Sequence, residues 1–113
     1  MTISQTLTQE VSQMEAELCS AFSDPTRILI LYALDEQPRS VTELTVELNL
    51  AQPTTSRHLK VLRDRGLVVA ERQGTSMLYK LADRRLIDAL DILRTVLRDR
   101  IMHRANLITE VVA

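Results

Sequence analysis

The side chains with the clearest chemical potential are polar groups spaced along residues 52–65, a stretch whose periodicity predicts a helix. On a helical wheel, Thr55, Leu59 and Leu62 share one face. The opposite face is small and polar at its start and charged further on; its members are Pro53, Ser56, Arg57, Lys60 and Asp64. An arginine can hold guanine O6 and N7 with two hydrogen bonds, and a glutamine such as Gln52 can hold adenine in the same way. The pattern suits a helix that lies in the major groove of DNA. An amphipathic helix with a solvated basic face is the alternative.

Start and stop signals frame this helix and two shorter ones before it. Asp24 followed by Pro25 is a good N-cap with a proline in the first turn. Ser40 with Glu43 three residues later predicts a capping box. The fourth helix has Gln52 in the N-cap region, Pro53 at the first helical position, and Gly66 as its stop. The predicted helices are residues 7–22, 25–35, 41–49 and 53–65.

After Gly66 the residue types change to those of strands. Residues 67–72 and 76–81 are β-prone, and Gln73-Gly74-Thr75 between them is a hairpin turn signal. A last helix is predicted over residues 84–109. Two short helices joined by a tight turn and followed by a hairpin make a winged helix-turn-helix. We therefore predict one domain over residues 1–113, mainly α with a β-hairpin wing at about 67–82, in the order α-α-α-α-β-β-α.

The charge is distributed unevenly along the chain. The formal net charge is −1. Residues 1–50 hold two arginines against eight acids, whereas residues 57–85 hold eight Lys and Arg against three acids. A local basic segment of this kind is typical of a surface that binds phosphates. At the hairpin tip, Arg72 and Gln73 are expected to contact DNA, whereas Lys80 is expected to be a solvated residue that discourages sheet pairing.

Both end helices carry apolar stripes. In the first helix the stripe is Leu7, Val11, Met14 and Leu18. In the last helix, steps of three or four residues separate Leu86, Leu90, Leu93, Leu97 and Ile101, which predicts a seam with a period of about 3.5 residues.

Four segments together resemble the ArsR/SmtB family of small repressors. The segment A-Q-P-T-T-S-R-H-L-K-V-L-R-D-R-G at 51–66 is similar to the family's recognition helix, and S-D-P-T-R-I-L at 23–29 to the start of its second helix. V-T-E-L at 41–44 and G-L-V at 66–68 also fit. The resemblance covers roughly residues 15–105.

The resemblance implies a homodimer that sits on a double-stranded DNA operator and leaves it when an inducer binds. It places the dimer interface on the first and last helices, in agreement with the two apolar stripes. It puts Gln52, Thr54, Ser56 and Arg57 in the major groove, beside Pro53, with Lys60, Arg72 and Gln73 completing the expected DNA-binding set.

The metal sites of this family are missing from the sequence. The arsenic or cadmium type places two cysteines on the third helix, where this chain has Val41-Thr42-Glu43-Leu44. On the last helix only Asp99 and His103 are candidate ligands, two per chain, which a dimer could double. The alternative without a functional role is a surface salt bridge between Asp99 and His103. No cofactor and no resident metal are therefore predicted.

Cys19 is the single cysteine, so the chain has no internal disulfide. A free cysteine is usually a small buried hydrophobe, and that is the expectation here. The functional alternative is a thiol that responds to oxidants or electrophiles. The inducer could thus be a small molecule, a redox signal or a metal, and a constitutive DNA binder without inducer is the competing function.

Other classes of protein are disfavoured. No glycine-rich phosphate loop, nucleophile elbow or paired carboxylates suggest an enzyme. A winged-helix module for protein interaction would have an uncharged or acidic fourth helix, and this one is basic. No secretory signal or run of about 18 apolar residues appears, so a cytoplasmic protein is expected.

Overall fold

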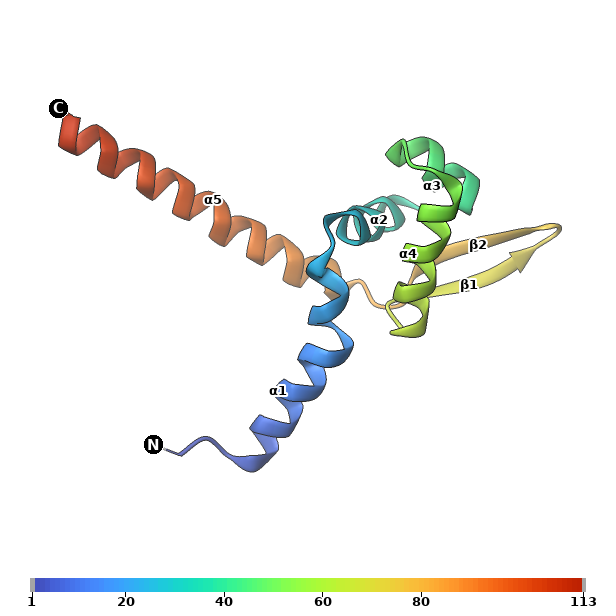
Figure 1. The fold of residues 1–113 in the computed structure, drawn as a ribbon, viewed down its shortest axis with the longest axis horizontal. Coiled ribbons are helices and arrows are strands. Elements are labelled where there is room, and N and C mark those ends of the chain that lie inside the picture. The colour runs from blue at the N-terminus through green and yellow to red at the C-terminus, as the bar shows by residue number, and fades with distance from the viewer. Residues whose placement is uncertain (1, 113) are drawn as a thin grey trace. The chain divides into compact units, whose positions relative to one another are not determined.

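The computed structural model describes residues 2–112 and shows a mainly helical chain with one hairpin (Figure 1). The elements are α1 (Gln5–Glu17), the 3-10 helix η1 (Cys19–Ser23), α2 (Pro25–Glu36), α3 (Val41–Leu48), α4 (Gln52–Asp64), β1 (Val68–Gln73), β2 (Ser76–Leu81) and α5 (Arg85–Val112). This order confirms the predicted winged helix-turn-helix class. The chain forms two compact units that divide after Asp83, and the expectation of a single domain stays a prediction.

The first helix differs from its predicted span of 7–22. It begins at Gln5, because the Ser4 side chain accepts a hydrogen bond from the Leu7 backbone N–H at 3.1 Å, and it ends at Glu17. The Ser20 hydroxyl donates to the Ala16 carbonyl and the Ser23 hydroxyl donates to the Ser20 carbonyl, at 2.7 and 2.8 Å. Serines that bond back to nearby carbonyls compete with the regular α-helical ladder. The chain therefore continues as the tighter η1.

The predicted caps of α2 and α3 are present. Asp24 accepts from the Thr26 backbone N–H at 2.8 Å, and Ser40 and Glu43 form both bonds of the capping box. Asn49 connects α3 to α4 with a positive φ of 52°, a conformation that asparagine tolerates better than most residues. These caps fix the tight turn between the two helices.

The start of α4 corrects one detail of the prediction. Ala51, not Gln52, is the N-cap, so Gln52 is the first helical residue and Pro53 follows it. At the other end Gly66 has a φ of +74°. Its N–H donates to the Arg63 carbonyl at 2.9 Å, and the Leu67 N–H donates to the Leu62 carbonyl at 2.9 Å. A left-handed glycine of this kind ends a helix by using its last carbonyls.

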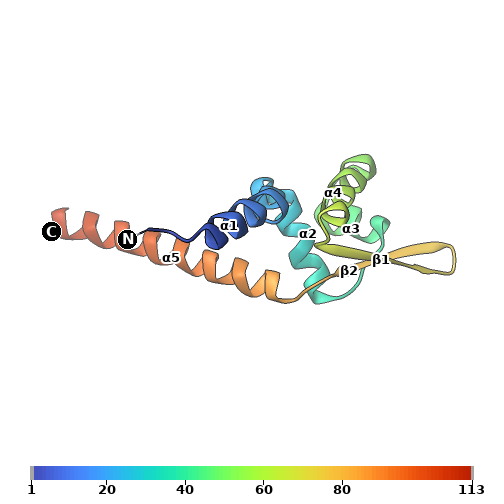
Figure 2. The same cartoon turned by 90° about the horizontal axis from the view of Figure 1, so that it is seen from below.

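The wing is an antiparallel hairpin of β1 and β2 with Val68 opposite Leu81 and Gln73 opposite Ser76. Its turn is Gly74-Thr75, with Gly74 at a φ of +61°. Figure 2 shows the hairpin extending away from α3 and α4. On the other edge of β2, Tyr79 exchanges two backbone hydrogen bonds with Arg39, at 2.8 and 3.0 Å. The segment before α3 thus holds β2 in place.

The core of the first unit lies between α2, α3, α4 and the start of β1. Its fully buried apolar members are Ile30, Leu31, Leu44, Leu59, Leu62, Leu67 and Val68. Each buried side chain of this size favours folding by about 1.5–3 kcal/mol over an exposed one. Burial of Leu59 and Leu62 fixes which side of α4 remains outside.

The end helices keep most of their apolar stripes exposed. In α1, Leu7, Val11 and Met14 are exposed, and Leu18 is half-buried. In the second unit, Leu86 is half-buried and Leu90 buried, whereas Leu93, Leu97 and Ile101 are 61%, 53% and 50% exposed. Among the described residues, no helix is both long enough and apolar enough to cross a membrane.

Candidate nucleic-acid interface

The helical wheel of α4 is reproduced by the structure. Thr55, Leu59 and Leu62 are buried. We call the opposite side the outer face of α4, and all its members are exposed: Pro53, Ser56, Arg57, Lys60 and Asp64. Gln52 is exposed as well, and Thr54 is half-buried. The outer face therefore offers small polar groups in the first turns and cations after them, on a helix whose other side is fixed in the core.

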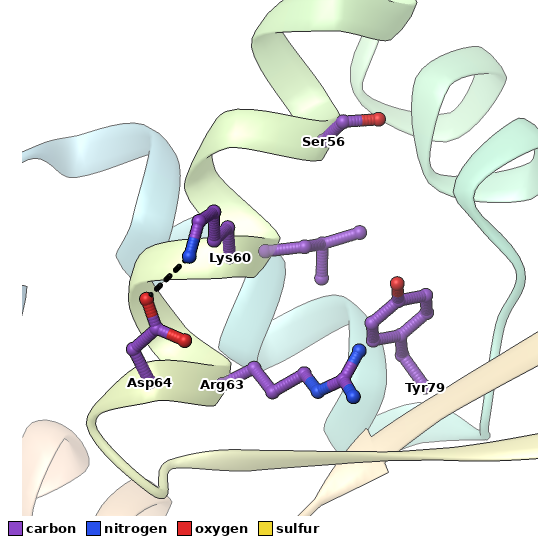
Figure 3. Close-up of a pocket in the computed structure, with 6 residues that line it drawn as sticks. Ser56, Lys60, Arg63, Asp64 and Tyr79 are labelled. Carbon is purple, nitrogen blue, oxygen red and sulfur yellow. Dashed lines mark hydrogen bonds and ion pairs between the residues drawn. The ribbon is translucent and has the colours of Figure 1, made fainter.

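The two cations of the outer face differ in how free their donors are. Arg57 Nη2 donates to Thr54 Oγ1 at 3.4 Å, a long bond that engages one of five guanidinium donors. Lys60 Nζ lies 2.9 Å from Asp64 Oδ2 in an ion pair one turn along the helix (Figure 3). Arg57 can therefore reach a base edge with two donors, whereas part of the Lys60 charge is neutralised by Asp64.

A pair of threonine hydroxyls joins α4 to α3. Thr55 is completely buried; its Oγ1 accepts from Thr45 Oγ1 at 3.2 Å and donates to the Ala51 carbonyl at 3.1 Å. Buried hydroxyls without partners are costly, so this chain of bonds satisfies Thr55 and ties the two helices. The wheel placed Thr55 inside, but its partner was missed because the bond depends on the tertiary packing of α3.

His58 links α4 to the start of α2. Its Nδ1 lies 3.5 Å from Arg27 Nη1, and its Nε2 lies 3.9 Å from Asp24 Oδ2. The backbone N–H of Thr26 lowers the pKa of the Asp24 carboxyl, and the charges of His58 and Arg27 lower it further. Through these two contacts His58 anchors α4 to the start of α2.

Two arginines connect α4 and α2 to the end of α1 and to η1. Arg65, the C-cap of α4, donates to the Ala16 carbonyl at 2.5 Å and to the Ser20 hydroxyl. Arg27 donates through Nε to the Ala21 carbonyl at 2.7 Å. Each arginine donates a hydrogen bond to a backbone carbonyl in the region where α1 ends and η1 follows. Sequence reasoning missed these contacts, since Arg65 and Ala16 are 49 residues apart.

A groove lies between α4 and the second strand of the wing. We call it the α4–β2 groove; it is lined by Ser56, Leu59, Lys60, Arg63, Asp64 and Tyr79. In Figure 3, Arg63 extends from α4 toward Tyr79, whereas Lys60 turns toward Asp64. Neither Arg63 nor Tyr79 was among the predicted DNA-binding residues. The basic segment that contains Arg63 was the only sequence signal for it.

The tip of the wing is polar and exposed. Arg72, Gln73, Thr75 and Ser76 are all exposed. Lys80 is instead paired with Glu71, with 2.5 Å between Nζ and Oε1. Arg72 is the cation at the tip, and the expectation that Lys80 discourages sheet pairing stays a prediction.

The candidate sensors lie in different surroundings. Asp99 and His103 are exposed on α5 and share a surface hollow with Arg100 and Arg104. In the described part of the chain no ion pair joins Asp99 to His103, and no group of three potential ligands gathers anywhere. Two arginines at the hollow also oppose a metal cation.

The expectation that Cys19 is buried is wrong, because Cys19 is exposed. It is the first residue of η1, and within that turn Ala21 is the residue that occupies the buried position.

Comparison with known proteins agrees with this architecture. Residues 24–69 match the family of bacterial regulatory proteins named arsR. The HTH-type transcriptional repressor SmtB of Mycobacterium tuberculosis is 42% identical over 78 residues, which are 69% of this chain and 58% of that repressor. The HTH-type transcriptional regulator NmtR of the same organism is 39% identical over 71% of this chain and 69% of its own length.

Solved structures show the same fold. The crystal structure of Rv0081 from M. tuberculosis has a TM-score of 0.75 and 34% identity, covering 84% of this chain and 96% of that chain. A homodimeric winged helix-turn-helix DNA-binding domain from Mycobacterium bovis has a TM-score of 0.75 at 23% identity, covering 91% of this chain and 95% of its own. The chain belongs to the ArsR/SmtB family, a family of helix-turn-helix transcriptional regulators and not of enzymes.

Proposed function

We propose that this protein is a transcriptional repressor that binds a palindromic DNA operator as a homodimer in the cytoplasm and is released by an inducer. The observation that carries the proposal is the outer face of α4. It presents Arg57 with free donors on a helix whose opposite side is locked into the core by Leu59 and Leu62.

The roles of the side chains follow from their exposure and chemistry. Base edges or nearby phosphates are contacted from the first turns of α4 by Gln52, Thr54, Ser56 and Arg57. Pro53 in the same turns allows the helix to approach the DNA closely. Lys60 and the wing residues Arg72 and Gln73 contact the phosphate backbone, which fixes position without reading sequence.

The dimer is built from the exposed apolar stripes of α1 and α5. Leu93, Leu97 and Ile101 are each at least half exposed in the single chain. A contiguous apolar surface of this kind marks an interface, and the M. bovis relative is a homodimer. A two-fold dimer presents two copies of α4, which requires two half-sites about one helical turn apart.

The test is binding by fluorescence anisotropy. A preferred duplex is selected from a random pool with the full chain, and its affinity is compared with that of a scrambled duplex. Arg57→Ala should lose most of the preference, about 1–3 kcal/mol per base pair that is no longer read, while the dimer remains. Arg98→Gln, which removes an exposed cation from α5, is the matched control. Equal binding of wild type to both duplexes would reject the proposal.

The release signal is a separate part of the proposal. The exposed thiol of Cys19 favours an oxidant or electrophile as the release signal. Cys19 lies in η1, and η1 is joined to α4 by the hydrogen bond from Arg65 to Ser20, so a reaction at the thiol could affect α4. The arginines beside Asp99 and His103 disfavour a metal. Binding titrated with oxidant, divalent metals and arsenite separates these signals, and binding that none of them changes supports a constitutive regulator or one with a small-molecule inducer.

A further inference from the structure

We propose that the α4–β2 groove holds a phosphate of the DNA backbone, with the Arg63 guanidinium and the Tyr79 hydroxyl as its donors. This inference rests on the proposed function, since it places the DNA strand between the fourth helix and the wing. The inference adds Arg63 and Tyr79, which are not part of the outer face of α4, to the DNA-binding residues.

Arg63 has the charge and the freedom that the site requires. It lies in the last turn of α4 and is exposed. Within residues 2–109, whose side chains the structure describes, no hydrogen bond or ion pair involves its guanidinium. The neighbouring Lys60 is already held by Asp64 at 2.9 Å. The net positive charge in the groove therefore comes from Arg63, whose planar donors match two phosphate oxygens.

Tyr79 supplies a neutral donor from a fixed position. Its backbone is bound to Arg39 by two hydrogen bonds, and the Arg39 side chain is itself buried and donates to the Ala33 carbonyl at 3.0 Å. The Tyr79 hydroxyl has no hydrogen-bond partner among the described side chains. Tyrosine hydroxyls are frequent donors to phosphate. Ser56 adds a second hydroxyl from the outer face of α4 at the same groove.

The position of the groove makes DNA the fitting source of the phosphate. Three residues, Ser56, Lys60 and Asp64, belong to both the groove and the outer face of α4. A duplex whose bases meet Arg57 thus carries its backbone past the groove. The other source of the same chemistry is a small free anion, and the experiment separates the two.

The experiment measures anisotropy binding of wild type, Arg63→Gln, Arg63→Lys and Tyr79→Phe to the selected and scrambled duplexes at several salt concentrations. Arg63→Gln should lower the affinity for both duplexes by the same factor. It should also make the slope of log K against log salt less negative by about one per lost phosphate contact, or about two per dimer. Arg63→Lys should restore the wild-type salt slope. Tyr79→Phe should weaken binding roughly two- to tenfold but leave the salt slope unchanged, because it removes a neutral donor.

The controls keep structural effects apart. Thermal unfolding checks that each variant is folded, and Arg98→Gln should leave the slope unchanged. A wild-type slope in Arg63→Gln, or a loss confined to the selected duplex, would overturn the proposal. Calorimetric titration with inorganic phosphate tests the other source: binding that Arg63→Gln removes, together with an unchanged DNA slope, would assign the groove to a free anion. Failure of the proposed function would appear differently, as a wild-type protein without preference between duplexes.

Discussion

The hydroxyl pair between α3 and α4 gives a prediction whose magnitude can be worked out from the structure. Thr55→Val keeps the shape of a completely buried side chain and removes its hydroxyl. Two hydrogen bonds are lost, to Thr45 Oγ1 at 3.2 Å and to the Ala51 carbonyl at 3.1 Å. The Ala51 carbonyl keeps the Thr55 backbone N–H at 3.0 Å, and the half-buried Thr45 can turn toward water.

The expected cost follows from these partners. Each hydrogen bond contributes about 0.5–1.5 kcal/mol net, and the added buried methyl of valine returns about 0.8 kcal/mol. Thr55→Val should therefore lower the free energy of unfolding by about 1 kcal/mol. In a double-mutant cycle with Thr45→Val, the coupling free energy should be about 0.5–1.5 kcal/mol, the share of the bond between the two side chains.

The assay is urea unfolding of wild type, both single variants and the double variant at one protomer concentration, because the stability of a dimer depends on concentration. The slope of the free energy of unfolding against urea concentration should be the same in all four proteins, which shows that the unfolded state is unaffected. If the effects of the two single variants add within about 0.3 kcal/mol, the two hydroxyls are not coupled. The threonines would then not be tied, and α4 would be held by its leucines alone.

Three further predictions concern the interface, the cap of α2 and the thiol. Leu93→Glu should turn the dimer into a monomer in sedimentation, since it puts a charge into the apolar seam, and Thr95→Glu should not; a Leu93→Glu dimer would remove the seam from the interface. The lowered pKa of Asp24 means that its contribution to stability is complete above the ordinary aspartate pKa of about 3.9 and is lost as the pH falls through the folded value. The thermal midpoint of wild type should therefore fall more steeply below about pH 4 than that of Asp24→Asn, which keeps a good cap; equal slopes would contradict this. Cys19→Ser should keep DNA binding under reducing conditions, and a loss of binding there would show a structural role for the thiol.

The sequence predicts what depends on local pattern. The two sides of α4, the capping box of Ser40 and Glu43, and the stop at Gly66 all follow from periodicity and helix-end chemistry. The end of α1 was mispredicted because its apolar spacing continues through Leu18, whereas the hydroxyls of Ser20 and Ser23 decide the backbone. The predicted burial of Cys19 was wrong because it depended on the general tendency of free cysteines, whereas Ala21 takes the buried position of η1.

The contacts that the sequence did not predict join distant segments. The α4–β2 groove exists because Arg39 fixes Tyr79 and thereby the strand beside α4. Neither the partner of Thr55 nor that of Arg65 has a periodic signature. Such pairs depend on how the helices pack, and a helical wheel contains no information about the neighbour it faces.

Methylation interference is the decisive measurement for the proposal that α4 reads base edges through Arg57. Guanine N7 is the atom that an arginine holds in the major groove. Methylation of N7 should prevent wild-type binding at symmetric guanines about one helical turn apart, and this interference should disappear for Arg57→Ala. If wild type binds selectively and N7 methylation changes its binding at no guanine, Arg57 does not read guanine in the major groove.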